Sequence, residues 1–324
     1  MFSTSSHAAI LRITGLTFLT LLSFVNHIMV SNFAITSEQP QNDAPVTKNR
    51  WKKPTDAPHT ATSRAPLLLS AGDALLDPVE WDMSPVVIED YKLIFFTQPK
   101  VGCTVFKQLF RRMAGKSNWM AENCCGKLPW NPETNGLTYL SHYNATAASR
   151  MLQDPTYTKA VFVRDPVTRF LSAYLDKAVR NPFFLQQKCA TAYQQQRRES
   201  AILSMEDFYV LAQQCDNPHW RSQVQRLPKP EYWKSINFVG YLEHAQEDTE
   251  RLLRRIGAWE ALGASGWGRD GQQAVFEGST GRHHATSAVS KRARYITPQL
   301  EARLRTELYA EDYRHPVFAR YNEL

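Results

Sequence analysis

Two segments of this 324-residue chain repeat one local order: a short apolar strand, a tight turn and then a helix. In the first, residues 92–97 are apolar and of strand length, and residues 98–103 carry the Pro and Gly of a turn. In the second, residues 160–163 form the strand, and Arg164-Asp165-Pro166 ends it before a helix. Strands that alternate with helices predict an α/β fold, with a parallel sheet flanked by helices.

Local signals place further elements. Thr104 is the expected N-cap of the first helix, and Gly115 its end. Residues 236–241 are typical of a strand and residues 243–256 of an amphipathic helix. Capping-type starts at Ser204 and at Thr297-Pro298 predict two more helices. Residues 263–281 are rich in Gly and predict a flexible loop, either an ordinary insertion or a gate over a binding site.

The chain divides into three predicted parts. Residues 1–35 contain Arg12 followed by an apolar run, which predicts a cytosolic tail and a membrane-spanning signal-anchor. A cleaved signal peptide and an organelle transit peptide are the alternatives. Residues 36–85 are rich in Pro and predict an extended stem, of which the apolar patch Leu67-Leu68-Leu69 is expected to dock on the folded part. Residues 86–324 form the predicted folded domain.

Charge and cysteine content narrow the chemistry. The formal net charge of +7 favours an anionic partner, which could be a nucleotide, a nucleic acid, an acidic glycan or a membrane surface. Five cysteines lack the C-x-x-C spacing of a zinc site, so no metal centre is expected. In an oxidising compartment Cys189 and Cys215 are candidates for a disulfide, and buried unpaired thiols are the alternative.

The first turn combines features of a phosphate site. Ligands of open α/β sheets bind beyond the carboxyl ends of strands, where a helix N-terminus attracts anions. Gly102 allows close approach of the backbone, Thr104 offers a hydroxyl group, and Lys107 lies one helical turn further on. The segment lacks the Walker A pattern, so it predicts a phosphate-like anion without identifying the nucleotide. A turn flanked by lysines that binds nothing is the alternative.

The second turn carries another candidate anion site. Arg164 stands at the end of a strand, where its guanidinium group can bind a phosphate through two hydrogen bonds. Arg169 and Ser172 share one helix face, so Ser172 can add a hydrogen bond to the same anion. Asp165 is expected to orient the arginines, and an Arg–Asp pair that only joins strand to helix is the alternative. Two anion sites on one sheet suit a nucleotide with phosphates at both ends.

These residues resemble a known family. Pro99-Lys100-Val101-Gly102-Cys103-Thr104-x-x-Lys107 resembles the 5′-phosphosulfate loop of the Golgi carbohydrate sulfotransferases, among them the HNK-1 and the chondroitin and dermatan 4-O enzymes. Phe162 to Lys177, with Arg164-Asp165-Pro166 and Ser172, resembles their 3′-phosphate segment. The resemblance implies a P-loop-like fold, the donor 3′-phosphoadenosine 5′-phosphosulfate (PAPS), and a single-pass type II Golgi membrane protein with its catalytic domain in the lumen.

The resemblance also implies roles for individual residues. Three sets are expected to bind the donor: Lys100, Val101, Gly102, Cys103, Thr104 and Lys107 at the 5′ end, Arg164 and Ser172 at the 3′-phosphate, and Thr286, Ser287 and Lys291 in a C-terminal loop. Lys100 is also the candidate for stabilising the leaving phosphate.

A general base must accept the proton of the acceptor hydroxyl, and histidine suits that task. His142 and His219 are the two candidates, with His142 ranked slightly ahead, and Glu206 and Asp207 are further possibilities. Asn144-Ala145-Thr146 is a glycosylation sequon, and a glycan at Asn144 would crowd an acceptor near His142.

The sequence therefore predicts an enzyme that transfers a sulfuryl group from PAPS to a hydroxyl group of a carbohydrate, with no metal. The expected partners are the carbohydrate acceptor and the membrane, without nucleic acid. Two alternatives are a P-loop-like kinase and a non-catalytic module that binds sulfated glycans.

Overall fold

The structure of the protein is a computed structural model. It describes residues 68–70, 72–77, 83–121, 132, 134–197, 202–277 and 286–322. The predicted membrane helix, its two alternatives and most of the predicted stem lie outside these residues. Within the described ranges, no helix is both long enough and apolar enough to cross a lipid bilayer.

Five strands form one sheet in the order β3-β1-β2-β4-β5. The strands are β1 (Val86–Ile88), β2 (Leu93–Phe96), β3 (Thr138–Tyr139), β4 (Thr158–Val163) and β5 (Phe238–Tyr241). The predicted strands at residues 92–97, 160–163 and 236–241 are therefore confirmed, with small shifts at their ends.

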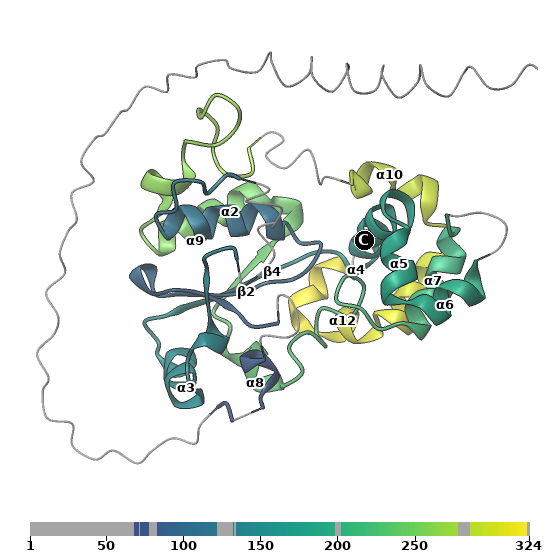
Figure 1. The fold of residues 1–324 in the computed structure, drawn as a ribbon, viewed down its shortest axis with the longest axis horizontal. Coiled ribbons are helices and arrows are strands. Elements are labelled where there is room, and N and C mark those ends of the chain that lie inside the picture. The colour runs from purple at the N-terminus through teal and green to yellow at the C-terminus, as the bar shows by residue number, and fades with distance from the viewer. Residues whose placement is uncertain are drawn as a thin grey trace, which may run out of the picture. The chain divides into compact units, whose positions relative to one another are not determined.

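Helices follow the strands and cover both faces of the sheet, with α2 and α9 on one face and α3 and α8 on the other (Figure 1). The α-helices are α2 (Cys103–Met113), α3 (Ala145–Gln153), α4 (Pro166–Tyr174), α5 (Phe183–Lys188), α6 (Ala190–Gln196), α7 (Met205–Gln214), α8 (Pro230–Ser235), α9 (Ala245–Arg255), α10 (Ala288–Tyr295), α11 (Pro298–Arg303) and α12 (Ala310–Arg314). Short 3₁₀ segments are η1 (Ala74–Leu76), η2 (Glu89–Tyr91), η3 (Leu140–His142), η5 (Leu242–His244) and η8 (Pro316–Tyr321), and π-helical segments are η4 (Leu175–Arg180), η6 (Trp259–Gly263) and η7 (Leu304–Leu308).

The sheet is mixed, which corrects the prediction of a parallel sheet. β2, β4 and β5 run parallel, as expected. β1 pairs antiparallel with β2 and with β3. Only residues 89–92 connect β1 to β2, and Lys92 in this connection has a left-handed backbone with φ of 46°. Such a short connection permits only an antiparallel pair, because parallel strands need a long crossover.

The pleat of the strands divides the core into two clusters. On β2, Leu93 and Phe95 face the cluster under α2 and α9, whereas Ile94 and Phe96 face the larger cluster under α4 and its neighbours. Alternate side chains of a strand point to opposite faces, so both faces of this strand are buried. This burial explains why residues 93–96 of β2, and likewise residues 160–163 of β4, are continuous apolar runs in the sequence.

The first helix starts differently from the prediction. Gly102, with φ of 69°, is its N-cap, and Thr104 lies inside the first turn, so Thr104 as N-cap is wrong. A residue with a Cβ is disfavoured at that angle, which explains the glycine. Gly115 ends the helix as predicted, since Gly115 and Lys116 donate to the carbonyl groups of Arg112 and Arg111 in the pattern of a Schellman motif.

The described part of the Gly-rich segment 263–281 is packed against the domain, which corrects the prediction of a flexible loop. Trp267 is 1% exposed, and Val275 is fully buried in the same core cluster as α2. Arg112 of α2 donates to the carbonyl groups of Leu262 and Ser265 over 2.9 and 2.6 Å. The glycines allow the tight bends between these anchors, so their density in the sequence reflects turns.

Part of the predicted stem packs on the domain. Leu69 and Leu75 are buried, and the backbone N–H of Leu69 donates to Ser149 over 2.9 Å. Asp73 accepts hydrogen bonds from Tyr232 and Lys229 at α8. Residues 68–70 and 72–77 are therefore held by apolar and polar contacts, whereas the predicted division at residue 86 stays a prediction.

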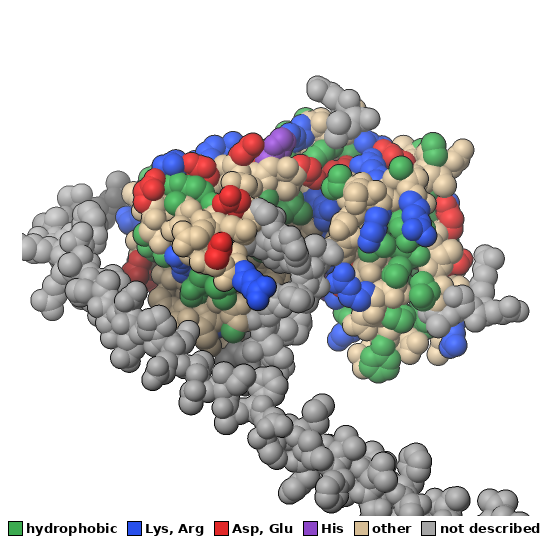
Figure 2. Space-filling view, turned by 90° about the horizontal axis from the view of Figure 1, so that it is seen from above, with side chains coloured by type: hydrophobic (Ala, Val, Ile, Leu, Met, Phe, Trp, Pro, Cys, Tyr) green, Lys and Arg blue, Asp and Glu red, His purple; other side chains and the backbone are tan. Residues whose placement is uncertain are grey.

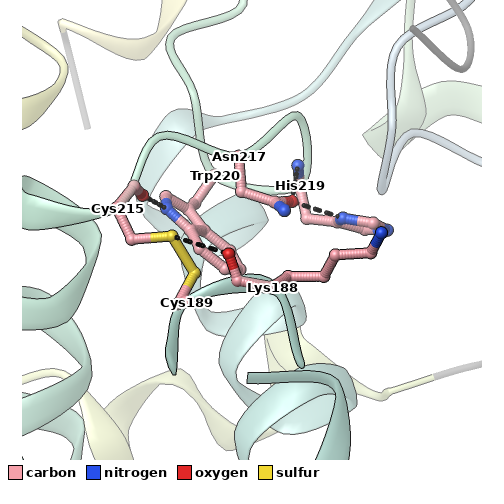
Figure 3. The surroundings of a disulfide bond; sticks show 6 residues. All are labelled: Lys188, Cys189, Cys215, Asn217, His219 and Trp220. Carbon is pink, nitrogen blue, oxygen red and sulfur yellow. Dashed lines mark hydrogen bonds between the residues drawn. A yellow bond between two sulfur atoms is a disulfide. The ribbon is translucent and has the colours of Figure 1, made fainter. Parts of the chain in front are cut away.

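Cys189 and Cys215 form a disulfide bond, with Cα atoms 5.7 Å apart. This agrees with the predicted pairing. The bridge joins the start of α6 to the loop after α7, and Trp220 of that loop donates from Nε1 to the carbonyl oxygen of Cys215 over 2.7 Å (Figure 3). Cys103 is outside any disulfide, and Cys124 and Cys125 lie outside the described residues.

Removal of this bridge is expected to lower the free energy of unfolding by about 3.5 kcal/mol, the chain-entropy value for a loop of this size. The bridged residues are 26 positions apart, so the bridge restricts a sizeable loop of the unfolded chain. Urea unfolding of the double variant Cys189→Ala/Cys215→Ala measures the loss, with Cys103→Ala as the control for removal of a thiol outside the bridge. A loss equal to that of the control would contradict a stabilising role.

Candidate active site

The first turn, residues 98–103, has an unusual backbone. Lys100 and Gly102 both lie in the left-handed region, with φ of 67° and 69°. Turns of this kind direct successive backbone N–H groups to one side, which creates a concavity that binds anions. For a lysine this conformation costs on the order of 1–2 kcal/mol. Backbone strain of this kind concentrates at functional sites, so the turn is a candidate ligand site on geometry as well as sequence.

The side chain of Lys100 is held by an acidic residue. Its Nζ lies 2.9 Å from Oδ2 of Asp176. The same Oδ2 lies 3.2 Å from Nζ of Lys177, and Oδ1 of Asp176 lies 4.0 Å from Nη1 of Arg180. Burial alone would raise the pKa of Asp176, but Lys100 and Lys177 outweigh it and keep the pKa far below its ordinary value. Asp176 is therefore a fixed negative charge among three cations, in the π-helical segment η4. Such π-helical turns are frequent at functional sites.

The other predicted residues of the 5′ end differ in exposure. Val101 and Lys107 are 2% and 1% exposed, so the side chain of Val101 belongs to the core. Cys103 and Thr104 are partly exposed at the start of α2. Leu242 and Phe276 lie over Gly102, where a Cβ would come within 3.1 and 3.2 Å of them. The close contact supplies a second reason for glycine at this position.

The second turn, residues 164–166, touches the first. Arg164 directly follows β4, and β2 and β4 are parallel neighbours, so both turns lie at the same rim of the sheet. Nη1 of Arg164 donates to the carbonyl oxygen of Lys100 over 3.2 Å. The guanidinium group is therefore already directed to the first turn. Figure 2 shows Lys and Arg side chains bordering a hollow in the face that it draws.

Arg169 joins the first turn to a distant loop. Its side chain is fully buried and donates to the carbonyl oxygens of Pro99, Arg221 and Pro218 over 2.9, 2.8 and 2.8 Å. These three bonds use the planar fork of the guanidinium group on backbone acceptors. Arg169 is accordingly a structural link between the first turn and the loop that carries His219.

Asp165 has partners other than those expected. Its side chain accepts from the N–H of Thr168, as the N-cap of α4, and from Nη1 of Arg292 over 2.7 Å and the hydroxyl of Tyr313 over 2.8 Å. The sequence predicts that Asp165 orients the arginines. None of these bonds joins it to Arg164. Asp165 instead attaches α4 to α10 and α12.

Two predicted groups that are far apart in the sequence come together. Oγ of Ser172 and Oγ1 of Thr286 are 3.0 Å apart and buried. Nζ of Lys291 donates to the carbonyl oxygen of Thr286 over 3.2 Å, and Ser287 is an exposed residue with φ of 50°. The structure therefore brings the C-terminal segment to the face of α4 that carries Ser172.

The two candidate histidines occupy different parts of the rim. His142 is exposed in η3, after the edge strand β3, and its Nδ1 accepts from the backbone N–H of Tyr139 over 3.4 Å. β1 lies between β3 and β2, so His142 is two strands away from the first turn. Asn144 of the sequon is an exposed N-cap of α3, and its Oδ1 accepts from Ala147.

His219 is close to the cluster formed by Lys100, Asp176 and Lys177, which we call the Lys100 cluster. Nζ of Lys177 lies 4.6 Å from the centroid of the Phe184 ring, and this ring meets the imidazole of His219 edge-on at 5.3 Å. Lys177 and Lys100 also act electrostatically on His219. The chain of contacts therefore runs from the first turn through Asp176 and Lys177 to His219.

The tautomer of His219 follows from its partner (Figure 3). The backbone N–H of His219 donates to Oδ1 of Asn217 over 3.1 Å, and Nδ1 of the ring lies 2.7 Å from the same atom. A backbone N–H can only donate, so this atom of Asn217 is the oxygen, and Nδ1 must donate to it as well. Nε2 is then left with a lone pair that can accept a proton.

His219 is expected to stay neutral well into the acid range. Burial, and then Lys177 and Lys100, lower its pKa well below the ordinary value, although Asp176 opposes them. In a proton NMR titration, we expect a midpoint well below about 6.5, the value of a free histidine. Lys177→Met should move the midpoint upward because it removes a nearby cation. A midpoint near 6.5 in the unmodified protein would contradict the burial of this ring.

The same shift has a consequence for stability. Below about pH 6.5 the unfolded chain binds a proton at this histidine that the folded chain excludes. The free energy of unfolding should therefore fall as the pH falls from that value towards the folded pKa.

The remaining candidates have structural partners. Glu206 pairs with Arg303 over 2.9 Å, and Asp207 accepts a hydrogen bond from Ser204 at the start of α7. The described residues contain no group of three or more His, Cys, Asp or Glu side chains arranged for a metal ion. The expectation that the reaction needs no metal stays a prediction.

Sequence reasoning missed three residues of the site. Asp176 lies within residues 162–177, where it is the only carboxylate besides Asp165. A lone carboxylate next to Lys177 could have been recognised as a partner for a lysine of the site. Gln223, whose side chain bonds the backbone N–H and carbonyl groups of Arg164, and Phe276, which lies over Gly102, belong to stretches without a motif. Phe276 has φ of 63° and Gln223 is fully buried, and neither property is visible in a sequence.

Comparison with known proteins identifies the chain. Residues 84–315 match the model described as the sulfotransferase family. The chain belongs to the sulfotransferase family. The matched part of the chain includes both turns, His219 and the segment from Thr286 to Lys291.

The chain is similar to several curated carbohydrate sulfotransferases. It is 28% identical to carbohydrate sulfotransferase 10 of Homo sapiens over 193 residues, which are 53% of this chain and 52% of that protein. It is 30% identical to carbohydrate sulfotransferase 10 of Danio rerio over 193 residues, with the same shares, and 26% identical to carbohydrate sulfotransferase 11 of Rattus norvegicus over 224 residues, 61% of this chain and 59% of that protein. The chain spans about half the length of the curated relatives it matches. No solved structure matches the chain.

Proposed function

We propose that this protein transfers a sulfuryl group from PAPS to a hydroxyl group of a carbohydrate. The observation that carries the proposal is the contact between the two turns, in which Nη1 of Arg164 lies 3.2 Å from the carbonyl oxygen of Lys100. Anion sites so close, on neighbouring parallel strands, suit the two ends of one adenosine bisphosphate. The carbohydrate acceptor is supported by the names of the relatives.

The 5′ end of the donor is assigned to the first turn. Its left-handed residues and the first turn of α2 offer backbone N–H groups to an anion. Lys100 is the cation assigned to the bridging oxygen, with Thr104 and Lys107 in the first turns of the helix. Val101, Gly102 and Cys103 contribute backbone groups.

The 3′-phosphate is assigned to the second turn and its neighbours. Arg164 supplies the planar cation, and the hydroxyl groups of Ser172 and Thr286, 3.0 Å apart, supply donors. Ser287 and Lys291 flank them at the start of α10. The adenine is assigned to a cavity of about 410 Å³ lined by Leu242, Glu243 and Phe276, because Leu242 and Phe276 also contact Gly102.

His219 is assigned as the general base, ahead of His142. Its free Nε2 lone pair, its neutral state and its position beside the Lys100 cluster all suit removal of a proton from a hydroxyl group. A bound phosphosulfate would also neutralise part of the charge of Lys100 and Lys177, and so raise the proton affinity of His219 when the donor is present. Binding of the donor therefore makes His219 a stronger base.

The chemical step follows from these positions. Sulfuryl transfer resembles phosphoryl transfer, in which the protein acts through alignment and charge stabilisation. His219 removes the proton of the acceptor hydroxyl, the hydroxyl oxygen bonds to sulfur, and the bond from sulfur to the phosphate oxygen breaks. The negative charge that develops on this phosphate is stabilised by Lys100 and by the backbone N–H groups of the first turn.

The location is proposed as the lumen of the Golgi, with a type II membrane anchor. The disulfide between Cys189 and Cys215 supports an oxidising compartment, where such bonds form and persist. The anchor itself falls in residues 1–35, which the structure does not describe.

Two assays test the proposal together. We expect adenosine 3′,5′-bisphosphate (PAP) to raise the melting temperature of the protein more than ATP does, and labelled sulfate to pass from PAPS to a member of a glycan panel. Stabilisation by ATP alone would favour the P-loop-like kinase. Binding of sulfated glycans without transfer and without PAP binding would favour the non-catalytic module.

A further inference from the structure

Gln223 contacts the second turn at both backbone groups of one residue. Its Oε1 accepts from the N–H of Arg164 over 3.1 Å, and its Nε2 donates to the carbonyl oxygen of Arg164 over 2.8 Å. The side chain is fully buried. These two hydrogen bonds satisfy the backbone N–H and carbonyl groups of Arg164, as a neighbouring strand would do. They therefore fix the backbone at the end of β4.

The same residue contacts the end of β2. Nε2 of Gln98 donates to the backbone carbonyl oxygen of Gln223 over 3.2 Å, and Gln98 is 2% exposed. Gln98 is the first residue of the first turn, two positions before Lys100. One residue from a distant loop therefore connects the two strand ends from which the anion-binding turns start.

The position of Gln223 is itself fixed. Asp312 of α12 is fully buried and accepts from the N–H of Gln223 over 3.1 Å, from the N–H of Val224 over 2.8 Å and from Oγ of Ser222 over 2.5 Å. Three bonds to one carboxylate hold the loop on both sides of Gln223. The loop cannot shift without leaving buried hydrogen-bonding groups unpaired, which is costly.

We propose that Gln223 is a positioning residue that sets the distance between the two anion-binding turns, acting through Arg164 and Gln98. The proposal rests on the proposed function, because the distance matters only for a ligand that has a phosphate at each end. When both ends bind at once, the second contact forms at a high effective concentration, and this gain requires the correct spacing. A ligand with one anionic end gains nothing from the spacing.

The test compares three ligands on the full-length protein. PAP occupies both ends, adenosine 5′-phosphosulfate has only the 5′ end, and adenosine 3′-monophosphate has only the 3′-phosphate. In Gln223→Met, which keeps the length of the side chain but not its polar atoms, we expect the dissociation constant of PAP to rise by about tenfold or more, in line with the gain from linked contacts. The constants of the two other ligands should change by less than about twofold, since each uses one turn only.

Controls separate positioning from a general loss of stability. Leu152→Ala removes a buried side chain of α3 and lowers stability without touching either turn, so its PAP affinity should equal that of the unmodified protein. If Gln223→Met does not fold, Gln98→Met removes the other half of the connection and is measured in the same way.

Equal weakening of all three ligands, or unchanged PAP affinity in a folded variant, would overturn the proposal. If the unmodified protein binds none of the three ligands, the proposed function fails and the positioning role fails with it. If the unmodified protein binds PAP but Gln223→Met changes the dissociation constants of all three ligands by the same factor, only the positioning role is lost.

Discussion

Replacement of His219 by alanine is expected to lower kcat for sulfate transfer by about 10³-fold, within the range for loss of a general base. The affinity for PAP should stay within about twofold, because a neutral side chain adds little to the binding of an anion. The basis is the neutral ring with a free Nε2, held by Asn217 beside the Lys100 cluster. Steady-state kinetics with saturating PAPS, together with calorimetric titration of PAP, measures both quantities.

His142→Ala is the matched control. The sequence ranked His142 slightly ahead of His219, but the structure places His142 two strands from the first turn. Its replacement should leave kcat within about threefold of normal, since surface substitutions have small effects. A large loss of kcat in His142→Ala, with normal turnover in His219→Ala, would reverse the assignment of the base.

Replacement of Arg164 by alanine is expected to weaken PAP binding by about 10²-fold. A hydrogen bond to a charged group contributes about 1.5–3 kcal/mol, and every 1.4 kcal/mol is a factor of ten, so the loss of one or two such bonds gives this magnitude. The binding of adenosine 5′-phosphosulfate should change far less, because it lacks the 3′-phosphate. Calorimetric titration of both ligands gives the ratio.

Arg180→Ala is the control for the removal of positive charge. Arg180 has a side chain that is 45% exposed and lies 4.0 Å from Asp176, near the site but outside the second turn. PAP affinity should fall by less than about threefold in this variant, because exposed charges are screened by solvent and salt. Equal losses in Arg164→Ala and Arg180→Ala would indicate attraction by net charge alone and contradict a specific phosphate contact.

Strong local patterns explain which elements the sequence predicts. Residues 93–96 and 160–163 are continuous apolar runs because both faces of β2 and β4 are buried. Pro166 marks the start of one helix and Gly115 the end of another through backbone constraints. β1 has three residues and β3 has two, too few for a periodic pattern. The antiparallel pairing of β1 with β2 follows only from the short connection at residues 89–92, and no pattern in the sequence predicts that β3 pairs with β1.

Site residues that directly follow a strand could be predicted from the sequence. Residues that meet only through tertiary contacts could not. Lys100, Gly102 and Arg164 follow strands directly, so a parallel sheet places them at one rim. The approach of Ser172 to Thr286 joins residues 114 positions apart, and only the resemblance suggested it. The burial of Lys107 and the backbone bonds of Arg169 could not be predicted, because a sequence shows neither the exposure nor the hydrogen-bond partners of a basic side chain.

A crystal structure of the protein with PAP would show directly whether one nucleotide bridges the two turns. We expect one PAP molecule across them, with its 5′-phosphate within about 2.7–3.2 Å of N–H groups of the first turn and its 3′-phosphate at the same range from Arg164 and Ser172. PAP bound at another surface, or with its 3′-phosphate directed away from Arg164, would contradict this arrangement.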